Sequence, residues 1–66
     1  MSSVGEEMPK EMARVREMLP IYDSIPMGLI AAGLMRAALD RAAVALAQGD
    51  VVAIIRSYAE LKDFKL

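Results

Sequence analysis

Residues 28–48 read GLIAAGLMRAALDRAAVALAQ, a stretch with only three charged side chains, Arg36, Asp40 and Arg41. Alanine, leucine and methionine favour the α-helix, so this stretch predicts one long helix. A helix on the surface of a small domain normally shows polar side chains over about half its circumference. This helix has too few of them, and we therefore expect other helices to cover most of its sides.

A shorter amphipathic helix is predicted before it, at about residues 8–19. Its apolar side chains recur with helical spacing; they are Met8, Met12, Val15 and Leu19, with Met18 beside them. Pro9 suits the first position of a helix, and Pro20 predicts its end. Residues 1–7 are expected to form a frayed leader. We expect the methionines to fill the core, although they could also form an adaptable surface for a partner helix.

Residues 20–26, PIYDSIP, are predicted to link the first helix to the long one. Ser24 is the expected N-cap of the long helix, which we place at about residues 26–48. The apolar side chains of the linker are expected to pin it to the core. Within the long helix, Arg36 and Asp40 are one turn apart, and this spacing predicts an ion pair.

The residues QGD at positions 48–50 predict a tight corner between two helices. Gly49 suits the left-handed end of the second helix, and Asp50 suits the N-cap of a third helix at about residues 50–63. The apolar face expected for the third helix consists of Val51, Ile54, Ile55, Tyr58 and Leu61. The side expected to face water carries Arg56, Ser57, Glu60 and Asp63. Phe64 and Leu66 are expected to fold back on the bundle.

A single small domain of 66 residues buries a limited core, and this chain has neither cysteine nor histidine to add disulfides or imidazole–metal bonds. The sequence therefore predicts an all-α three-helix bundle assembled as a homo-oligomer, most simply a two-fold dimer. The candidate interface residues are Met12, Leu34, Met35, Ala38, Ala42 and Leu46. The alternative is a monomer in which the first and third helices cover the long helix unaided.

The residue types that carry most enzyme chemistry are scarce in this chain. Without histidine or cysteine, it lacks the usual general base and the thiol nucleophile. Gly28 and Gly33 do not form a phosphate-binding loop, because no strand precedes them and no Gly-Lys-Ser/Thr follows. The sequence therefore predicts no catalytic residue, no metal site and no cofactor, and we expect a non-enzymatic interaction module.

Net charge and hydropathy limit the kinds of partner that the sequence predicts. With a net charge of −1, the chain lacks the basic surface that phosphate backbones require, so nucleic acid is not the expected partner. The alternative function is a regulator that binds nucleic acid or a small anion through arginines gathered in the oligomer. The candidate contacts for such a ligand are Tyr22, Arg36 and Arg41. Neither a signal peptide nor a membrane span is apparent, so we expect a cytoplasmic protein.

Residues 27–62 resemble short helical proteins encoded in phages and prophages. The shared features are the alanine-rich helix, the Gly-Asp corner at positions 49–50 and the ending RSYAELK. The resemblance implies an all-helical fold and an origin in a mobile element. Because such proteins have no settled activity, it implies no site residues.

Overall fold

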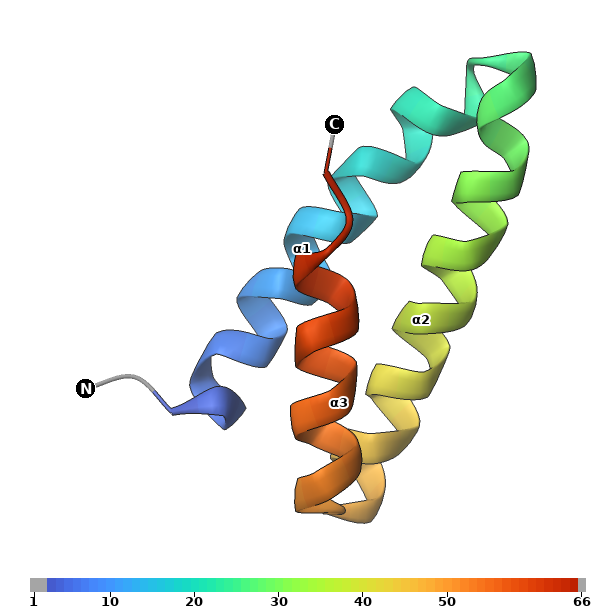
Figure 1. Cartoon of the computed structure of the whole chain (residues 1–66). Helices are drawn as coiled ribbons and strands as arrows, with labels where there is room; N and C mark the ends of the chain where they lie inside the picture. The colour runs from blue at the N-terminus through green and yellow to red at the C-terminus, as the bar shows by residue number, and fades with distance from the viewer. Residues whose placement is uncertain (1–2, 66) are drawn as a thin grey trace.

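The computed structural model describes residues 3–65 and shows three α-helices joined by short connections (Figure 1). Helix α1 spans Val4–Asp23, α2 spans Leu29–Gln48 and α3 spans Val51–Lys62; the short 3₁₀ helix η1, Pro26–Gly28, precedes α2. Each of the three α-helices contacts the other two, and the molecule measures 37 × 22 × 15 Å. The predicted all-α three-helix bundle is confirmed.

Helix α1 is longer at both ends than predicted. It begins at Val4 because the Ser3 hydroxyl accepts a hydrogen bond from the Glu6 N–H at 3.2 Å, so most of the expected leader is helical. Pro9 and Pro20 both lie inside the helix. An internal proline removes one hydrogen bond, but the contacts around α1 are sufficient to hold the helix beyond both positions.

The connection between α1 and α2 differs from the prediction. Ser24 is the C-cap of α1, where its backbone N–H donates to the Pro20 carbonyl and its hydroxyl donates to the Ile21 carbonyl at 2.7 Å. It therefore does not cap α2. Ile25 is extended, and the chain then turns through η1, which leads directly into α2.

The core lies where methionines of α1 meet alanines of α2. The buried cluster consists of Met8, Met12, Val15 and Met18 of α1, Met35, Ala38, Leu39 and Ala42 of α2, and Leu61 of α3. Long flexible side chains on one helix fill the space that small side chains on the other leave open. The interpretation of the methionines of α1 as core residues is confirmed.

The corner at residues 48–50 forms as predicted. Gly49 has φ 65°, in the left-handed region, and the next N–H, that of Asp50, donates back to the Ala45 carbonyl at 3.2 Å. The Asp50 carboxylate accepts from the Ala53 N–H at 3.1 Å and caps α3. Both signals are local, which is why the sequence predicts them well.

The face that α3 buries is rotated relative to the prediction. Leu61 is buried and Ile54 and Tyr58 are half-buried, as expected, but Val51 and Ile55 are more than half exposed. Ser57, expected in water, is only 7% exposed. The small side chains of α2 allow α3 to approach closely, and at that distance a serine fits where a bulkier residue does not.

The C-terminal segment after α3 returns to α1. Phe64 is half-buried against the core, which confirms that it folds back. The same expectation for Leu66 lies outside the described residues.

Candidate interaction surface

Helix α2 is covered unevenly along its length. Arg41 of α2 pairs with Glu60 at 2.8 Å, and α3 ends at Lys62, two residues beyond Glu60. α2 and α3 run in opposite directions. α3 therefore lies beside α2 from the corner at Gly49 back to about Arg41, and it ends shortly beyond this point. Figure 1 shows α3 ending part of the way along α2, so the first half of α2 is left with α1 as its main neighbour.

The uncovered end of the molecule carries a cluster of large apolar side chains, which we call the apolar tip. It comprises Ile21, Ile25, Met27, Leu29, Ile30 and Leu34. Met27 is 89% exposed and Ile30 is 78% exposed. Single exposed apolar residues are ordinary, but here three consecutive elements contribute large exposed apolar side chains to one end of the molecule.

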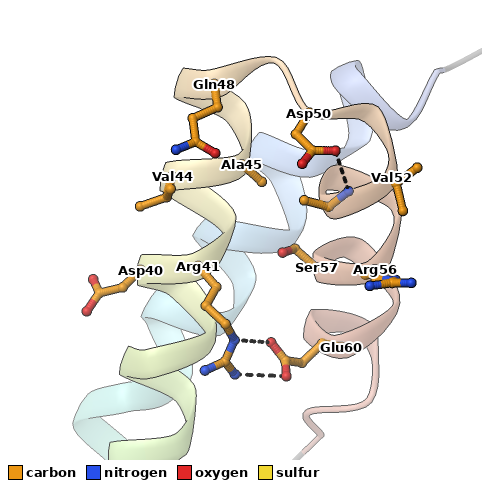
Figure 2. A pocket seen from close by; sticks show the side chains of 11 residues that line it. Asp40, Arg41, Val44, Ala45, Gln48, Asp50, Val52, Arg56, Ser57 and Glu60 are labelled. Carbon is orange, nitrogen blue, oxygen red and sulfur yellow. Dashed lines mark hydrogen bonds and ion pairs between the residues drawn. The ribbon is translucent and has the colours of Figure 1, made fainter.

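A groove between the C-terminal half of α2 and α3 has a volume of about 580 Å³ (Figure 2). Small side chains form its base: Ala45 and Ser57 are buried, and Ala53 is half-buried. The exposed Val44 and Val52 stand at its two sides. An apolar base with room above it can accept side chains from outside, and we call this feature the α2–α3 groove.

Charged residues surround the groove. Arg41 and Glu60 bridge it through two hydrogen bonds, of 3.3 and 2.8 Å. Figure 2 shows Asp40 and Arg56 on the outer sides of α2 and α3, and neither makes an ion pair within residues 3–65. The groove therefore has an apolar base and a rim of mixed charge.

The tip and the groove lie along the same side of α2. Side chains at spacings of three and four residues share one helix face. Five positions of α2 follow this spacing: Ile30, Leu34, Ala37, Arg41 and Val44. This set, which we call the α2 stripe, runs from the apolar tip into the groove, and all of its members except Ala37 are exposed.

Most of the predicted interface residues lie elsewhere. Met12 of α1 and Met35, Ala38 and Ala42 of α2 are at most 6% exposed, because they pack together in the buried cluster of the bundle. They belong to the core of the chain, and their prediction as partner contacts is corrected on this ground. Leu46 is half-buried against the same core, whereas Leu34 is exposed and belongs to the α2 stripe.

The three predicted ligand contacts each have a separate partner. Arg36 pairs with Asp23 rather than with Asp40, because α1 extends far enough to bring this carboxylate beside α2. The hydrogen bond to Asp23 and its negative charge raise the pKa of Arg36 above its ordinary value. Arg41 pairs with Glu60 on α3, and the Tyr22 hydroxyl donates to the Lys65 carbonyl at 2.7 Å. These contacts do not gather the three side chains into one anion site.

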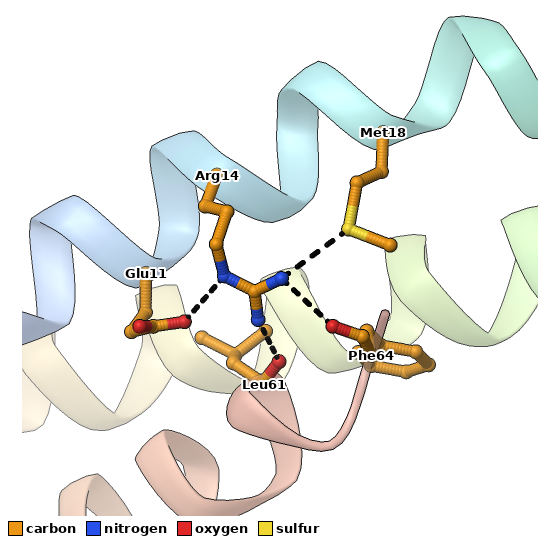
Figure 3. Close-up of polar contacts among 5 residues, drawn as sticks. All are labelled: Glu11, Arg14, Met18, Leu61 and Phe64. Carbon is orange, nitrogen blue, oxygen red and sulfur yellow. Dashed lines mark hydrogen bonds and ion pairs between the residues drawn. The ribbon is translucent and has the colours of Figure 1, made fainter. Parts of the chain in front are cut away.

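Arg14 is an organising residue that the sequence did not predict (Figure 3). Its guanidinium donates to the Leu61 and Phe64 carbonyls, each at 2.8 Å, and pairs with Glu11 at 2.8 Å. The final carbonyls of a helix lack partners within it, and a guanidinium supplies several donors in a fixed plane. Arg14 therefore holds the end of α3 against α1, although nearly 50 residues separate the partners in sequence.

Between residues 3 and 65, no group of three or more His, Cys, Asp or Glu side chains is placed to hold a metal ion. None of the helices in that range has the length and hydropathy to cross a membrane. No family model matches the chain, and no curated protein or solved structure matches it either.

Proposed function

We propose that the protein is a non-enzymatic helical interaction module that works as a homodimer. The observation that carries the proposal is the exposed α2 stripe together with the apolar tip. Burying apolar surface contributes roughly 25 cal/mol per Å², so several large exposed side chains on one face give a substantial drive for association. A small chain that leaves this surface in water gains stability when a second molecule covers it.

A second copy of the chain is the simplest partner. In a two-fold dimer, the same surface is contributed by both subunits, so the surface must complement itself. The α2 stripe carries large apolar groups at both ends, Ile30 and Val44, with the small Ala37 between them. Ile30 and Val44 are equally far from Ala37 in the sequence, a spacing that is compatible with a two-fold contact.

The polar groups around the groove support a binding role rather than a catalytic one. Asp50 is engaged with the Ala53 N–H, and Glu60 is engaged with Arg41. Ser57 is the one hydroxyl-bearing side chain among the residues that line the groove, and no histidine or lysine lines it in the described chain. A serine nucleophile requires a base within hydrogen-bond reach.

We also propose that the module is cytoplasmic and is encoded in a phage or prophage, on the basis of composition and of the resemblance in residues 27–62.

The test is the solution mass of the full chain, measured by light scattering after size exclusion across a dilution series. We expect a dimer that dissociates on dilution. Ile30→Glu should be monomeric, because it places a charge on the exposed apolar face, and its helical circular dichroism should persist. Ala43→Glu is the matched control, since Ala43 is exposed on α2 but lies off the stripe. A wild-type monomer at every concentration would overturn the proposal.

A further inference from the structure

We infer that the two copies pack with their α2 helices antiparallel about a two-fold axis at Ala37, so that the apolar tip of each enters the α2–α3 groove of the other. This inference rests on the proposed homodimer and specifies its geometry. It joins the two surface features that the bundle leaves open, the tip and the groove, into one reciprocal contact.

The spacing along α2 places the tip and the groove at matching distances. Ile30 and Val44 lie seven residues before and after Ala37. Seven residues are about two turns, or about 10.5 Å, along a helix. A two-fold axis through Ala37 therefore brings Ile30 opposite Val44 of the partner subunit, at the edge of the groove. Met27, three residues before Ile30 in η1, then lies further along the same groove.

The two surfaces also complement each other in shape. Met27 and Ile30 are the most exposed of the large apolar side chains and project from the end of the molecule. The groove has a volume of about 580 Å³ because its base is made of alanine and serine. Large side chains on one surface and small ones on the other are the condition for close packing across an interface. The flexible methionine side chain adapts to an irregular space.

Charge distinguishes this geometry from its alternatives. The tip residues are uncharged, so inserting them between the charged sides of the groove brings no like charges together. Packing groove against groove would instead bring the charged rims of both copies to the same interface, which costs free energy because more charged groups lose their water. Packing tip against tip would bury the apolar tip but leave Val44 and Val52 exposed.

The centre of the contact suits two helices that approach closely. Ala37 is small, and a Cβ added to Gly33, one turn earlier, would meet nothing within 4 Å. The distance between packed helices falls when the side chains at the crossing are small. The structure therefore has open space at Gly33, one turn from Ala37, beside the point where a second α2 would cross.

Cysteine cross-linking tests this geometry directly, because the chain has no cysteine of its own. Ala37→Cys should form a disulfide-linked dimer, since only a residue at the axis meets its own counterpart at the Cα distance of about 4.4–6.8 Å that a disulfide needs. A mixture of Ile30→Cys and Val44→Cys chains, treated with a short bis-maleimide, should give the mixed product in excess over like-with-like products. Ala43→Cys is the control and should not cross-link.

Filling the groove gives a second, independent test. Ala53→Leu should raise the dissociation constant of the dimer at least tenfold, because the added side chain occupies the space for the tip. Ala59→Leu, on an exposed position of the same helix, should leave the dissociation constant unchanged. Circular dichroism should show that both variants remain helical.

The outcomes separate the inference from the proposed function. A monomer by light scattering would overturn both. A stable wild-type dimer in which Ala37→Cys does not cross-link, or in which Ile30→Cys links mainly to itself, would retain the homodimer and overturn the antiparallel geometry. An unchanged dissociation constant for Ala53→Leu would remove the groove from the interface.

Discussion

The two halves of α2 have similar composition and opposite environments. Between Arg41 and Gln48, the helix is packed between α1 and α3, and its buried residues are alanines that let both neighbours approach. Between Leu29 and Ala37, α3 is absent, and leucine and isoleucine face outward. The difference comes from the 12-residue length of α3 rather than from α2 itself. A nearly uniform apolar helix thus acquires a buried half and an exposed half from its neighbours.

The largest expected effect comes from a charge in the enclosed half. Ala42 is fully buried against α1, so Ala42→Glu should lower the free energy of unfolding by at least about 3 kcal/mol, or prevent folding. Ala43→Glu, the neighbouring exposed position, should change it by less than about 0.5 kcal/mol. Urea unfolding followed by circular dichroism measures both. Equal stability of the two variants would contradict the packing of this half.

The next largest effect on stability is expected at Gly28, the residue that directly precedes the exposed half of α2. A Cβ added at Gly28 would lie 2.4 Å from the Tyr22 carbonyl oxygen, and backbone atoms cannot move aside easily. Gly28→Ala should therefore cost about 2 kcal/mol. Gly33→Ala meets open space and should stabilise the helix by up to about 1 kcal/mol. Thermal unfolding in the monomeric Ile30→Glu background would compare them, and a stabilising Gly28→Ala would refute the close contact.

Removing the contact between α1 and the end of α3 should have a smaller effect. Arg14→Gln loses the part-buried hydrogen bonds to the Leu61 and Phe64 carbonyls and should cost about 1–2 kcal/mol. Backbone hydrogen exchange should accelerate at Asp63 and Phe64. Arg16→Gln, at an exposed position of α1, is the control. If exchange rose equally in both variants, Arg14 would not be what anchors this segment.

The smallest predicted effect concerns the two ends of α3. Asp50→Ala removes the N-cap hydrogen bond and should cost about 1 kcal/mol. Asp63→Ala removes a negative charge from the C-terminal end of the helix, where it opposes the helix dipole, and should stabilise by a few tenths of a kcal/mol. Opposite signs in thermal unfolding would confirm the capping geometry, and a neutral Asp50→Ala would contradict it.

The sequence predicts best where the deciding contacts are local. The start of α3 and the corner at residues 48–50 follow from Gly49 and Asp50, whose partners lie within a few residues. The ends of α1 were predicted less well, because Pro20 alone favours a stop while contacts around Tyr22 extend the helix to Asp23. Such contacts come from segments distant in the chain and leave no local signal.

The interaction surface was the hardest feature to predict. The alanine-rich faces of α2 look alike in sequence, so spacing alone could not decide which one α1 would cover. The spacing favours Ala38 and Ala42 as partner contacts, yet the chain buries them itself. Leu34, predicted for the same interface, is exposed because α3 ends too early to cover it. The exposed face of α2 therefore depends on which of its faces α1 and α3 cover, and this becomes clear only once the bundle is assembled.

The core rich in methionine has a consequence for oxidation chemistry. Met8, Met12, Met18 and Met35 are buried, and conversion of any of them to the sulfoxide would place a polar group in the core. Folding shields their sulfur atoms from peroxide, whereas Met27 is 89% exposed in the single chain. Mild oxidation of the monomeric Ile30→Glu variant should therefore modify Met27 before any of these four methionines and leave the bundle folded. Sulfoxide at the four buried positions should then accumulate only as fast as the bundle opens. Mass spectrometry of these residues would therefore measure the rate at which the bundle unfolds.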